Sequence, residues 1–445
     1  GVWVGSSSYK ASYAWHNSGR YPYKSIMGGD GMQIAVDLRD NNTVYTGYQF
    51  GNYFRINKNS GQTDYITPKH ELGERPLRWN WQAPIHLSIH NQDILYMGSN
   101  KVHRSFNQGG DFEAISKDLT TGGIKGDVAY STLTSINESP LKFGLLYAGS
   151  DDGLIHVSKD GGVSWQKITQ GLPEKMWVTT VLASAHEKSR VYASLNGYRW
   201  DDFNKYVYVS EDYGKTWKAI GNDLPNEPVN VIHEDPENPN LLYVGTDHGL
   251  YVSLDRGNSF MQMKKGLPSV SVHDVVVHAR EKDLIVGTHG RSIYVANIEH
   301  LQALDKTLLK KPLHLFAMND VRYSSRWGSS WNNYRPASEY ELQIPVYTST
   351  AGKMKIQIKT EKGLVLKTIE QEAVKGMNYI NYNLSFDEKQ GKAFTKYLNE
   401  IKKKDAKDVK IKAAKNGQFY LKRATYEVTV TKGGETATQN LKIGK

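Results

Sequence analysis

Acidic residues outside tight turns are the first candidates for chemistry in this chain of 445 residues. Hydrolysis of a glycosidic bond needs two carboxylates that flank the bond, roughly 5 to 10 Å apart. Asp30, in the string GGDG, and Asp202, in the string RWDDFNKY, are the pair that we predict to be catalytic if the protein is an enzyme. The alternative interpretation is that both are solvated loop acids or Asx-turn residues.

Aromatic and basic residues in predicted loops are candidates for ligand binding. Planar rings stack on sugar rings or peptide side chains, and Arg pairs with carboxylates. The predicted ligand-binding residues are Trp79, Trp81, Arg199, Trp200, His289 and Arg291, with Tyr198, Trp327 and Trp331 as further loop aromatics. Alternatively, Trp79 and Trp81 wedge between structural repeats. For His289 the alternative is a structural turn, which the related position of His248 in another repeat favours.

Other kinds of site have no signal in the sequence. The chain has no cysteine, which excludes disulfides, thiolate metal sites and cysteine nucleophiles. It also lacks an H-E-x-x-H zinc motif, a P-loop, a dinucleotide-binding glycine motif and a G-x-S-x-G elbow. We therefore predict no metal and no cofactor.

A repeated element must position the candidates. The segment LYAGSDDGLIHVSKDGGVSWQKI (146–168) recurs in five other copies, some of them weak. The copies align at Tyr45, Tyr96, Tyr147, Tyr192, Tyr243 and Ile285, which lie 51, 51, 45, 51 and 42 residues apart. This spacing is typical of a four-stranded β-propeller blade, and apolar residues alternate within each copy as in strands. We predict a propeller of six to seven blades over residues 1–300.

The turn S-x-D-x-G-x-x-W recurs in three copies. Its Asp can accept hydrogen bonds from its own turn, its Gly can take positive φ, and its aromatic residue can pack between blades. The residues concerned are Asp160 and Trp165, Asp212 and Trp217, and Asp255 and Phe260. We interpret these Asp residues as structural, because the chemistry of the turn already explains them.

The pattern changes after residue 300. Residues 301–338 are predicted as a linker with a short helix, and residues 339–445 as an Ig- or fibronectin-like β-sandwich with a Lys-rich helical insertion. Residues 335–445 hold 22 basic and 12 acidic residues and so carry the entire net charge of +10. Any docking to an anionic surface should depend on this part. Its lysines lack interleaved aromatics, so nucleic acid is not a predicted partner.

The repeats resemble those of a known family. The strings GGDGMQIAVD (28–37), PLRWNWQAPIHLS (76–88), PVNVIHEDPENPNLLYVGTDHGLYVSLDRG (228–257) and LIVGTHGRSIYV (284–295) look like bacterial BNR or Asp-box repeat proteins, which are sortilin-like and carry a glycosyl hydrolase label. The resemblance implies a secreted or cell-surface protein and a further N-terminal propeller in a longer polypeptide. The sialidase R-I-P motif is not matched, because Phe54-Arg55-Ile56 is followed by Asn57.

Three functions remain open from the sequence. We expect an extracellular, cell-surface or periplasmic propeller that binds a glycan or peptide through its loop face. The second hypothesis is a glycoside hydrolase with a carboxylate pair in a propeller cleft, similar to tandem-propeller xyloglucan-cleaving enzymes. The third is a structural or accessory subunit of an outer-membrane protein complex.

Overall fold

The computed structural model describes residues 1–6, 22–122, 130–330, 337–404 and 407–444. Among these residues the α-helices are α2 (Glu299–Gln302) and α3 (Gly391–Ile401), and almost all other regular structure is β. The chain divides into two compact units, Gly1–Ile298 and Glu299–Lys445. The predicted all-β fold is confirmed.

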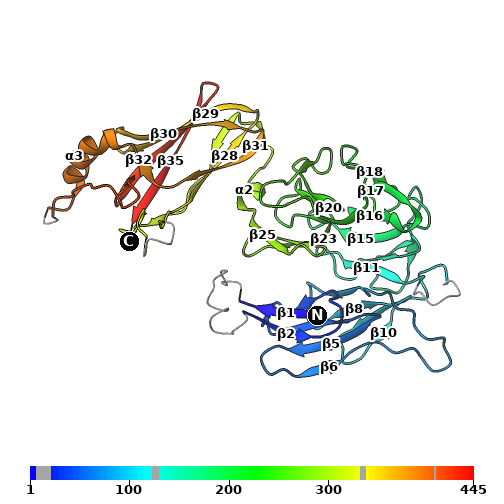
Figure 1. Cartoon of the computed structure of the whole chain (residues 1–445). Helices are drawn as coiled ribbons and strands as arrows, with labels where there is room; N and C mark the ends of the chain where they lie inside the picture. The colour runs from blue at the N-terminus through cyan, green and yellow to red at the C-terminus, as the bar shows by residue number, and fades with distance from the viewer. Residues whose placement is uncertain (7–21, 123–129, 331–336, 405–406, 445) are drawn as a thin grey trace. The chain divides into compact units, whose positions relative to one another are not determined.

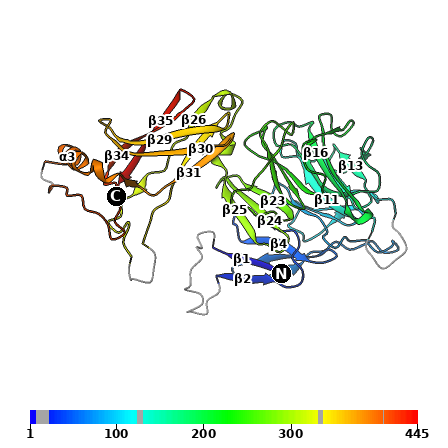
Figure 2. The same ribbon diagram turned by 45° about the horizontal axis from the view of Figure 1, so that its top comes forward.

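The first unit is a succession of antiparallel sheets (Figure 1 and Figure 2). A two-stranded sheet comes first, formed by β1 (Val2–Gly5) and β2 (Tyr23–Met27). Five four-stranded sheets follow in chain order: β3 (Ala35–Val36), β4 (Thr43–Tyr48), β5 (Asn52–Asn57), β6 (Thr63–Tyr65); β7 (Ile85–Leu87), β8 (Leu95–Gly98), β9 (Val102–Ser105), β10 (Glu113–Ala114); β11 (Leu133–Glu138), β12 (Leu146–Ser150), β13 (Ile155–Ser158), β14 (Gln166–Lys167); β15 (Trp177–Ala183), β16 (Val191–Gly197), β17 (Asp202–Ser210), β18 (Lys218–Ala219); β19 (Val229–Glu234), β20 (Leu242–Thr246), β21 (Gly249–Ser253), β22 (Met261–Gln262).

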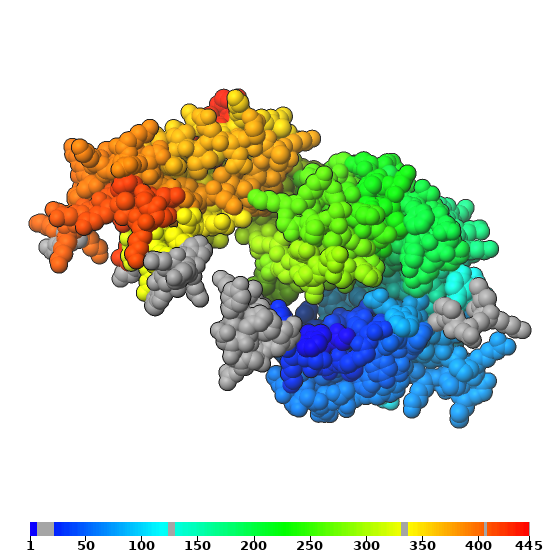
Figure 3. Space-filling model, in the orientation of Figure 1, coloured from blue at the N-terminus to red at the C-terminus, as the bar shows by residue number. Residues whose placement is uncertain are grey.

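A three-stranded sheet of β23 (Val272–His278), β24 (Asp283–Thr288) and β25 (Ile293–Asn297) ends the unit. The first strands of neighbouring sheets contact one another in the order β3, β7, β11, β15, β19 and β23. This arrangement is the predicted β-propeller, and the space-filling view shows the unit hollowed between its blue and green parts (Figure 3).

The second strand of each four-stranded sheet lies deepest. β8, β12, β16 and β20 are buried along their whole length. A strand flanks each of them on either side, and neighbouring sheets cover their faces, which suits the mostly apolar residues on these strands. The buried polar exceptions are Ser150, Ser194, Asn196 and Thr246. The tyrosines that align the repeats lie on these strands and on β4, with no exposed surface: Tyr45, Tyr96, Tyr147, Tyr192 and Tyr243.

Two of these tyrosines hold neighbouring sheets together. The hydroxyl of Tyr96 donates to Glu138 Oε1 at 3.0 Å, and that of Tyr192 donates to Glu234 Oε1 at 2.9 Å. Each glutamate is the last residue of the first strand in the next sheet, and each is buried. A buried carboxylate needs such donors, because an unpaired charge in the interior is costly.

Tyr147 lacks this interaction. Its hydroxyl is buried without a hydrogen-bond partner among the described residues. The strand register places Ala183 in the next sheet at the position that Glu138 and Glu234 occupy in theirs. The methyl group of Ala183 cannot accept the hydrogen bond.

The three predicted Asp turns share one geometry. In each turn, one Asp oxygen accepts from the Ser two residues earlier at 2.8 Å and from the backbone N–H four residues later at 2.9 Å, as seen at Asp160, Asp212 and Asp255. The indoles of Trp165 and Trp217 donate to Ile115 and Ile168 in the preceding sheets, at 2.8 and 2.7 Å. These turns are therefore built as a local hydrogen-bonded element whose aromatic residue joins two blades.

The second unit has two main sheets around one core. One sheet orders β26 (Leu313–Leu315), β28 (Leu342–Thr348) and β31 (Gly376–Tyr382); the other orders β27 (Val321–Arg322), β35 (Glu435–Gly444), β34 (Ala424–Lys432), β29 (Gly352–Thr360) and β30 (Val365–Ala373). A small sheet pairs β32 (Ser385–Phe386) with β33 (Phe419–Tyr420), and α3 adds Phe394, Tyr397 and Leu398 to the core. The Ig- or fibronectin-like topology stays a prediction.

The segment predicted as a linker is partly sheet. Within residues 301–338, β26 pairs with β28 and β27 pairs with β35, so this segment contributes to both sheets. Trp327 is 5% exposed and packs in the core of the unit instead of lining an open loop. Trp331 lies outside the described residues.

Candidate functional site

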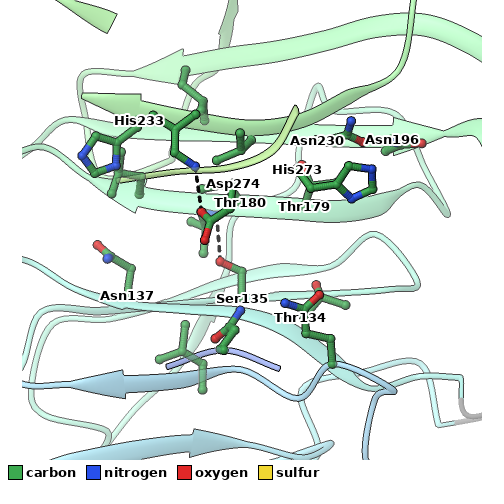
Figure 4. A pocket seen from close by; sticks show the side chains of 18 of the residues that line it. Thr134, Ser135, Asn137, Thr179, Thr180, Asn196, Asn230, His233, His273 and Asp274 are labelled. Atoms are coloured by element: carbon green, nitrogen blue, oxygen red, sulfur yellow. Dashed lines mark hydrogen bonds between the residues drawn. The ribbon is translucent and has the colours of Figure 1, made fainter. Parts of the chain in front are cut away.

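The first strands of the propeller sheets run parallel to one another around a cavity. Hydrogen bonds across neighbouring strands fix this direction: Ser135 accepts from Val181 N at 3.0 Å and Asn137 accepts from Ala183 N at 2.9 Å. The cavity has a volume of about 560 Å³. Its polar lining residues come from the first strands β7, β11, β15, β19 and β23, from the end of β16 and from residues 33, 82, 198 and 199. They include Thr134, Ser135, Thr180, Asn196, Asn230, His233, His273 and Asp274 (Figure 4).

A bulge in the first strand explains why consecutive polar residues face the cavity. The register shifts at the same place in four sheets, between Leu133 and Ser135, Val178 and Thr180, Val229 and Val231, and Val272 and Asp274. A bulge lets two adjacent residues project to one side of a strand. His273 and Asp274 therefore both line the cavity, which simple alternation would forbid.

The cavity wall is largely uncharged at neutral pH. Burial lowers the pKa of His233 to about 4. Burial, and then the nearby His289, lower the pKa of His273. Burial also lowers the pKa of His86, against the opposing effect of Glu138. Neutral imidazole, hydroxyl and amide groups can each donate and accept hydrogen bonds, so the wall suits a ligand rich in hydroxyl or amide groups.

Asp274 is the only carboxylate that lines this cavity among the described residues. The Asp274 side chain is exposed, but the surface on which it is exposed is the wall of the cavity, which other parts of the protein surround. Burial raises its pKa, and the hydrogen bond from Val275 N at 2.9 Å opposes that rise in part. Figure 4 shows Asp274 near the centre of the view, with His233 and His273 on either side.

The predicted site residues gather on one face of the propeller. In a four-stranded antiparallel sheet, the loop that joins the second strand to the third and the loop that leads to the next sheet lie at the same end of the sheet. Because the first strands are parallel, these connections from all blades form one surface, which we call the loop face. It holds Asp30, Trp79, Trp81, Arg199, Trp200, His289 and Arg291, with Asp202 at the first position of β17.

The structure does not bring the predicted carboxylate pair into the cavity. Asp30 accepts from Gln49 Nε2 at 3.0 Å. Asp202 accepts from Asn204 N at 3.0 Å and from the Tyr206 hydroxyl at 2.7 Å. These bonds, the one from Asn204 N first, lower the pKa of Asp202, which suits a turn residue better than a proton donor. Their catalytic role stays a prediction.

The two tryptophans of the PLRWNW stretch differ. Trp79 stacks on His103 with ring centroids 6.0 Å apart and packs against the hydrophobic core between the sheets of β3–β6 and β7–β10. Asn80, which lies between the two tryptophans in the sequence, is buried and donates to the Thr132 hydroxyl at 2.8 Å. Trp81 is 50% exposed and meets Phe50 edge to face. Trp79 therefore contributes packing, and Trp81 leaves a ring open on the loop face.

A cluster of aromatic rings and one arginine lies at the cavity mouth. The guanidinium of Arg199 lies 3.9 Å from the ring centroid of Trp177 and 4.6 Å from that of Tyr198. All three residues line the cavity, and Arg199 has no carboxylate within ion-pair distance among the described residues. The turn η1 (Tyr198–Trp200) sets this position, and Trp200 beside it is 45% exposed. We call Trp177, Tyr198 and Arg199 the mouth cluster.

His289 extends this polar surface. Its ring lies 5.2 Å from that of His273, which lines the cavity. Arg291 is exposed on the same connection. Nearby, Asp247 accepts from Asn230 at 3.0 Å and from Ser271 at 3.1 Å. Trp177, His233, His273 and Asp274 were not predicted, because they lie on strands whose apolar pattern indicates only structure.

The described part of the chain shows neither a metal-binding cluster nor a membrane-spanning helix. No group of three or more His, Asp or Glu side chains is arranged to hold a metal ion there. No helix in that part is long and apolar enough to cross a membrane.

Part of the propeller matches known proteins. Residues 205–303 match the family described as Sortilin-Vps10, "Sortilin, neurotensin receptor 3". A xyloglucanase of Hypocrea jecorina is 28% identical over 141 residues, which are 28% of this chain and 17% of that protein. A vacuolar protein sorting/targeting protein 10 of Laccaria bicolor is 31% identical over 128 residues, 26% of this chain and 8% of that protein. The matched part thus spans less than a fifth of either relative.

Solved structures include similar propellers. The GH74 xyloglucanase of Xanthomonas campestris is 13% identical with a TM-score of 0.46, covering 71% of this chain and 50% of that one. The GH74 enzyme of Niastella koreensis is 13% identical with a TM-score of 0.45, covering 92% and 65%. The family match confirms the predicted resemblance to sortilin-like Asp-box proteins.

Proposed function

We propose that the first unit is an extracellular or cell-surface ligand-binding propeller whose loop face binds a glycan that carries a carboxylate group. The observation that carries this proposal is Arg199, held between two aromatic rings at the cavity mouth without a carboxylate partner among the described residues. A guanidinium in that setting pairs with a ligand carboxylate. Exposed Trp81 and Trp200 offer ring faces for sugars.

The cavity wall supports a glycan over a peptide. Its neutral His, Ser, Thr and Asn side chains form a surface of mixed donors and acceptors that sugar hydroxyls can use. A peptide that ends in a carboxylate would also find Arg199. Binding to a peptide instead of a glycan is therefore an outcome that the experiment must separate.

The test is a binding screen of the full chain on acidic glycans, their carboxyl-reduced forms and peptides. We expect acidic glycans to bind and the reduced forms to bind far more weakly. Arg199→Ala should lower affinity about ten- to a hundredfold, which is the range of a charge-assisted hydrogen bond. Lys159→Ala is the matched control, because Lys159 also lies over a ring, that of Tyr213 at 4.4 Å, but on an Asp turn.

Two results would contradict the proposal. Binding that Arg199→Ala leaves unchanged would show that the mouth cluster is not the site. Preference for peptides over every glycan would show that the ligand class is wrong, with the site retained only if Arg199→Ala still weakens binding.

A glycoside hydrolase is the second candidate, favoured by the match to a xyloglucanase. Turnover of a polysaccharide such as xyloglucan by the full chain would support it. If Asp30→Asn and Asp202→Asn leave that turnover unchanged, these two residues are not its catalytic pair. Binding without turnover would favour the ligand-binding propeller.

A further inference from the structure

The second unit contains a basic pocket that is separate from the loop face of the propeller. It forms where the segment that begins with β27 meets the segment before β34. Asn416 N donates to the Gly328 carbonyl at 3.0 Å and joins the two segments. Gly328 has φ +70, and a Cβ there would lie 2.5 Å from Tyr420 Cε2, so the segments touch closely. Two adjoining hollows of about 520 and 240 Å³ open at this junction and share Tyr323, Ser324 and Ser325.

Six cationic side chains line these hollows, and no carboxylate lines either. They are Arg322, Arg326, Lys412, Lys415, Lys422 and Arg423, which define the basic pocket. None of the six has an ion-pair partner among the described residues. Two acids near them in the chain or at the junction have other partners: Glu339 accepts from Asn416 at 3.2 Å, and Asp320 pairs with Lys442 at 3.6 Å. Like charges gathered without counter-charges repel one another, so an anion bound among them is stabilised.

Another hollow in the same unit shows the contrast. It is lined by Lys353, Lys355 and Lys432, but also by Glu370 and Glu372. Elsewhere Lys362 pairs with Glu400 at 2.6 Å and Lys367 with Asp387 at 2.9 Å. Lysines of this unit therefore commonly have acidic neighbours, and the basic pocket departs from that pattern.

Aromatic rings contact two of the cations in the basic pocket. Arg423 lies 5.0 Å from the ring centroid of Tyr323, and Lys422 Nζ donates to the Tyr323 hydroxyl at 3.3 Å. Trp327 and Tyr420 are each only 5% exposed. The third ring, that of Tyr323, is half-buried and already has Arg423 and Lys422 over it. Little ring face is therefore left among these residues for the stacking of nucleic-acid bases, which single-strand binding proteins use. Serine hydroxyls beside fixed cations fit a compact, multiply charged oxyanion.

We propose that the basic pocket binds phosphate or sulfate ester groups, carried either by a saccharide or by a lipid headgroup. This second site is independent of the loop face. Its ligand is held by charge and by hydroxyl donors, so its affinity falls as salt shortens the Debye length from about 10 Å at 0.1 M to about 3 Å at 1 M.

The experiment measures binding of the full chain to a heparin-derived oligosaccharide and to phosphatidylcholine vesicles with and without phosphatidic acid. The pocket variant is Lys415→Gln with Arg423→Gln, two exposed side chains whose loss does not disturb the core. We expect it to weaken binding about 25-fold, at about fivefold for each cation. Lys353→Gln with Lys355→Gln removes the same charge elsewhere and should change binding less than twofold. Inorganic pyrophosphate should compete.

Each outcome decides the question. Binding to the oligosaccharide alone, or to acidic vesicles alone, supports the proposal and names the source of the ester. A second pocket variant, Ser325→Asp, should weaken binding as well. Equal loss in the pocket and control variants would show a diffuse charge effect and overturn the proposal. Tighter binding of single-stranded DNA than of either probe would also overturn it.

Discussion

The buried tyrosines allow a test with opposite results at equivalent positions. Tyr192→Phe removes the donor to Glu234, a hydrogen bond of 2.9 Å to a buried carboxylate. Loss of a hydrogen bond to a charged group costs about 1.5 to 3 kcal/mol. Tyr147→Phe removes a hydroxyl that is buried without a partner among the described residues. That change should be neutral or stabilising, since an unsatisfied polar group is removed.

The expected melting shifts follow from the size of the unit. An unfolding entropy of about 2.1 cal/mol/K per residue, applied to the 298 residues from Gly1 to Ile298, gives about 0.6 kcal/mol/K. Tyr192→Phe should therefore lower the Tm of this unit by about 2 to 5 °C. Tyr147→Phe should leave the Tm unchanged or raise it.

Differential scanning calorimetry of the full chain measures both variants under the same conditions. Tyr96→Phe is a second test of the first kind, because Tyr96 donates to Glu138. A Tm that Tyr147→Phe lowers as much as Tyr192→Phe would contradict this expectation. Equal losses would mean that removal of the hydroxyl group itself, and not loss of the hydrogen bond to the glutamate, sets the cost.

Three further predictions concern single side chains. The hydrogen bond from the Ser164 hydroxyl, with others of the same turn, lowers the pKa of Asp160 from 3.8 to about 2. The ionised Asp160 carboxylate therefore stabilises the folded state above about pH 4, and this stabilisation is lost as the pH falls towards about 2. Urea unfolding across that range should show a smaller loss of stability in Asp160→Asn than in the wild type, and parallel curves would contradict this. Burial raises the pKa of Asp274 above 3.8, so the ionised carboxylate opposes folding, and Asp274→Asn should raise the Tm at pH 7 but not below about pH 4. A Tm gain that persists in acid would contradict the assignment. Trp217→Phe removes the indole donor to the Ile168 carbonyl and should cost about 1 kcal/mol or more in calorimetry; no loss would show that the ring alone joins the blades.

The repeat was predictable because its signals are local. The spacing from Tyr45 to Ile285 gives the blades, and the Ser, Asp and Gly spacing gives the turns. The Tyr–Glu contacts were not predicted: the strand register of the structure shows that Glu138 and Glu234 stand at one position, where another copy has Ala183. These features depend on residues in one blade or in two adjacent blades.

The cavity was not predictable in the same way. Its lining residues range from Gln33 to Val276, and no local pattern indicates that such distant residues share one cavity. A bulge also breaks the alternation that would otherwise indicate which residue of His273 and Asp274 faces inward. The basic pocket likewise combines Arg322 and Arg326, which lie before the Lys-rich region, with Lys412 to Arg423.

The way neighbouring blades join has a consequence for exchanging one blade with another. The blade of β7–β10 meets the next through Tyr96 and Glu138, whereas the blade of β11–β14 meets its successor through Thr134, which donates to the Val178 carbonyl at 2.6 Å, and through Ser135 and Asn137. The boundary after β15–β18 has the same Tyr–Glu contact as the boundary after β7–β10, through Tyr192 and Glu234. A blade moved from one kind of boundary to the other would therefore meet side chains suited to a different neighbour, whereas a blade moved between the two Tyr–Glu boundaries would find the same contact.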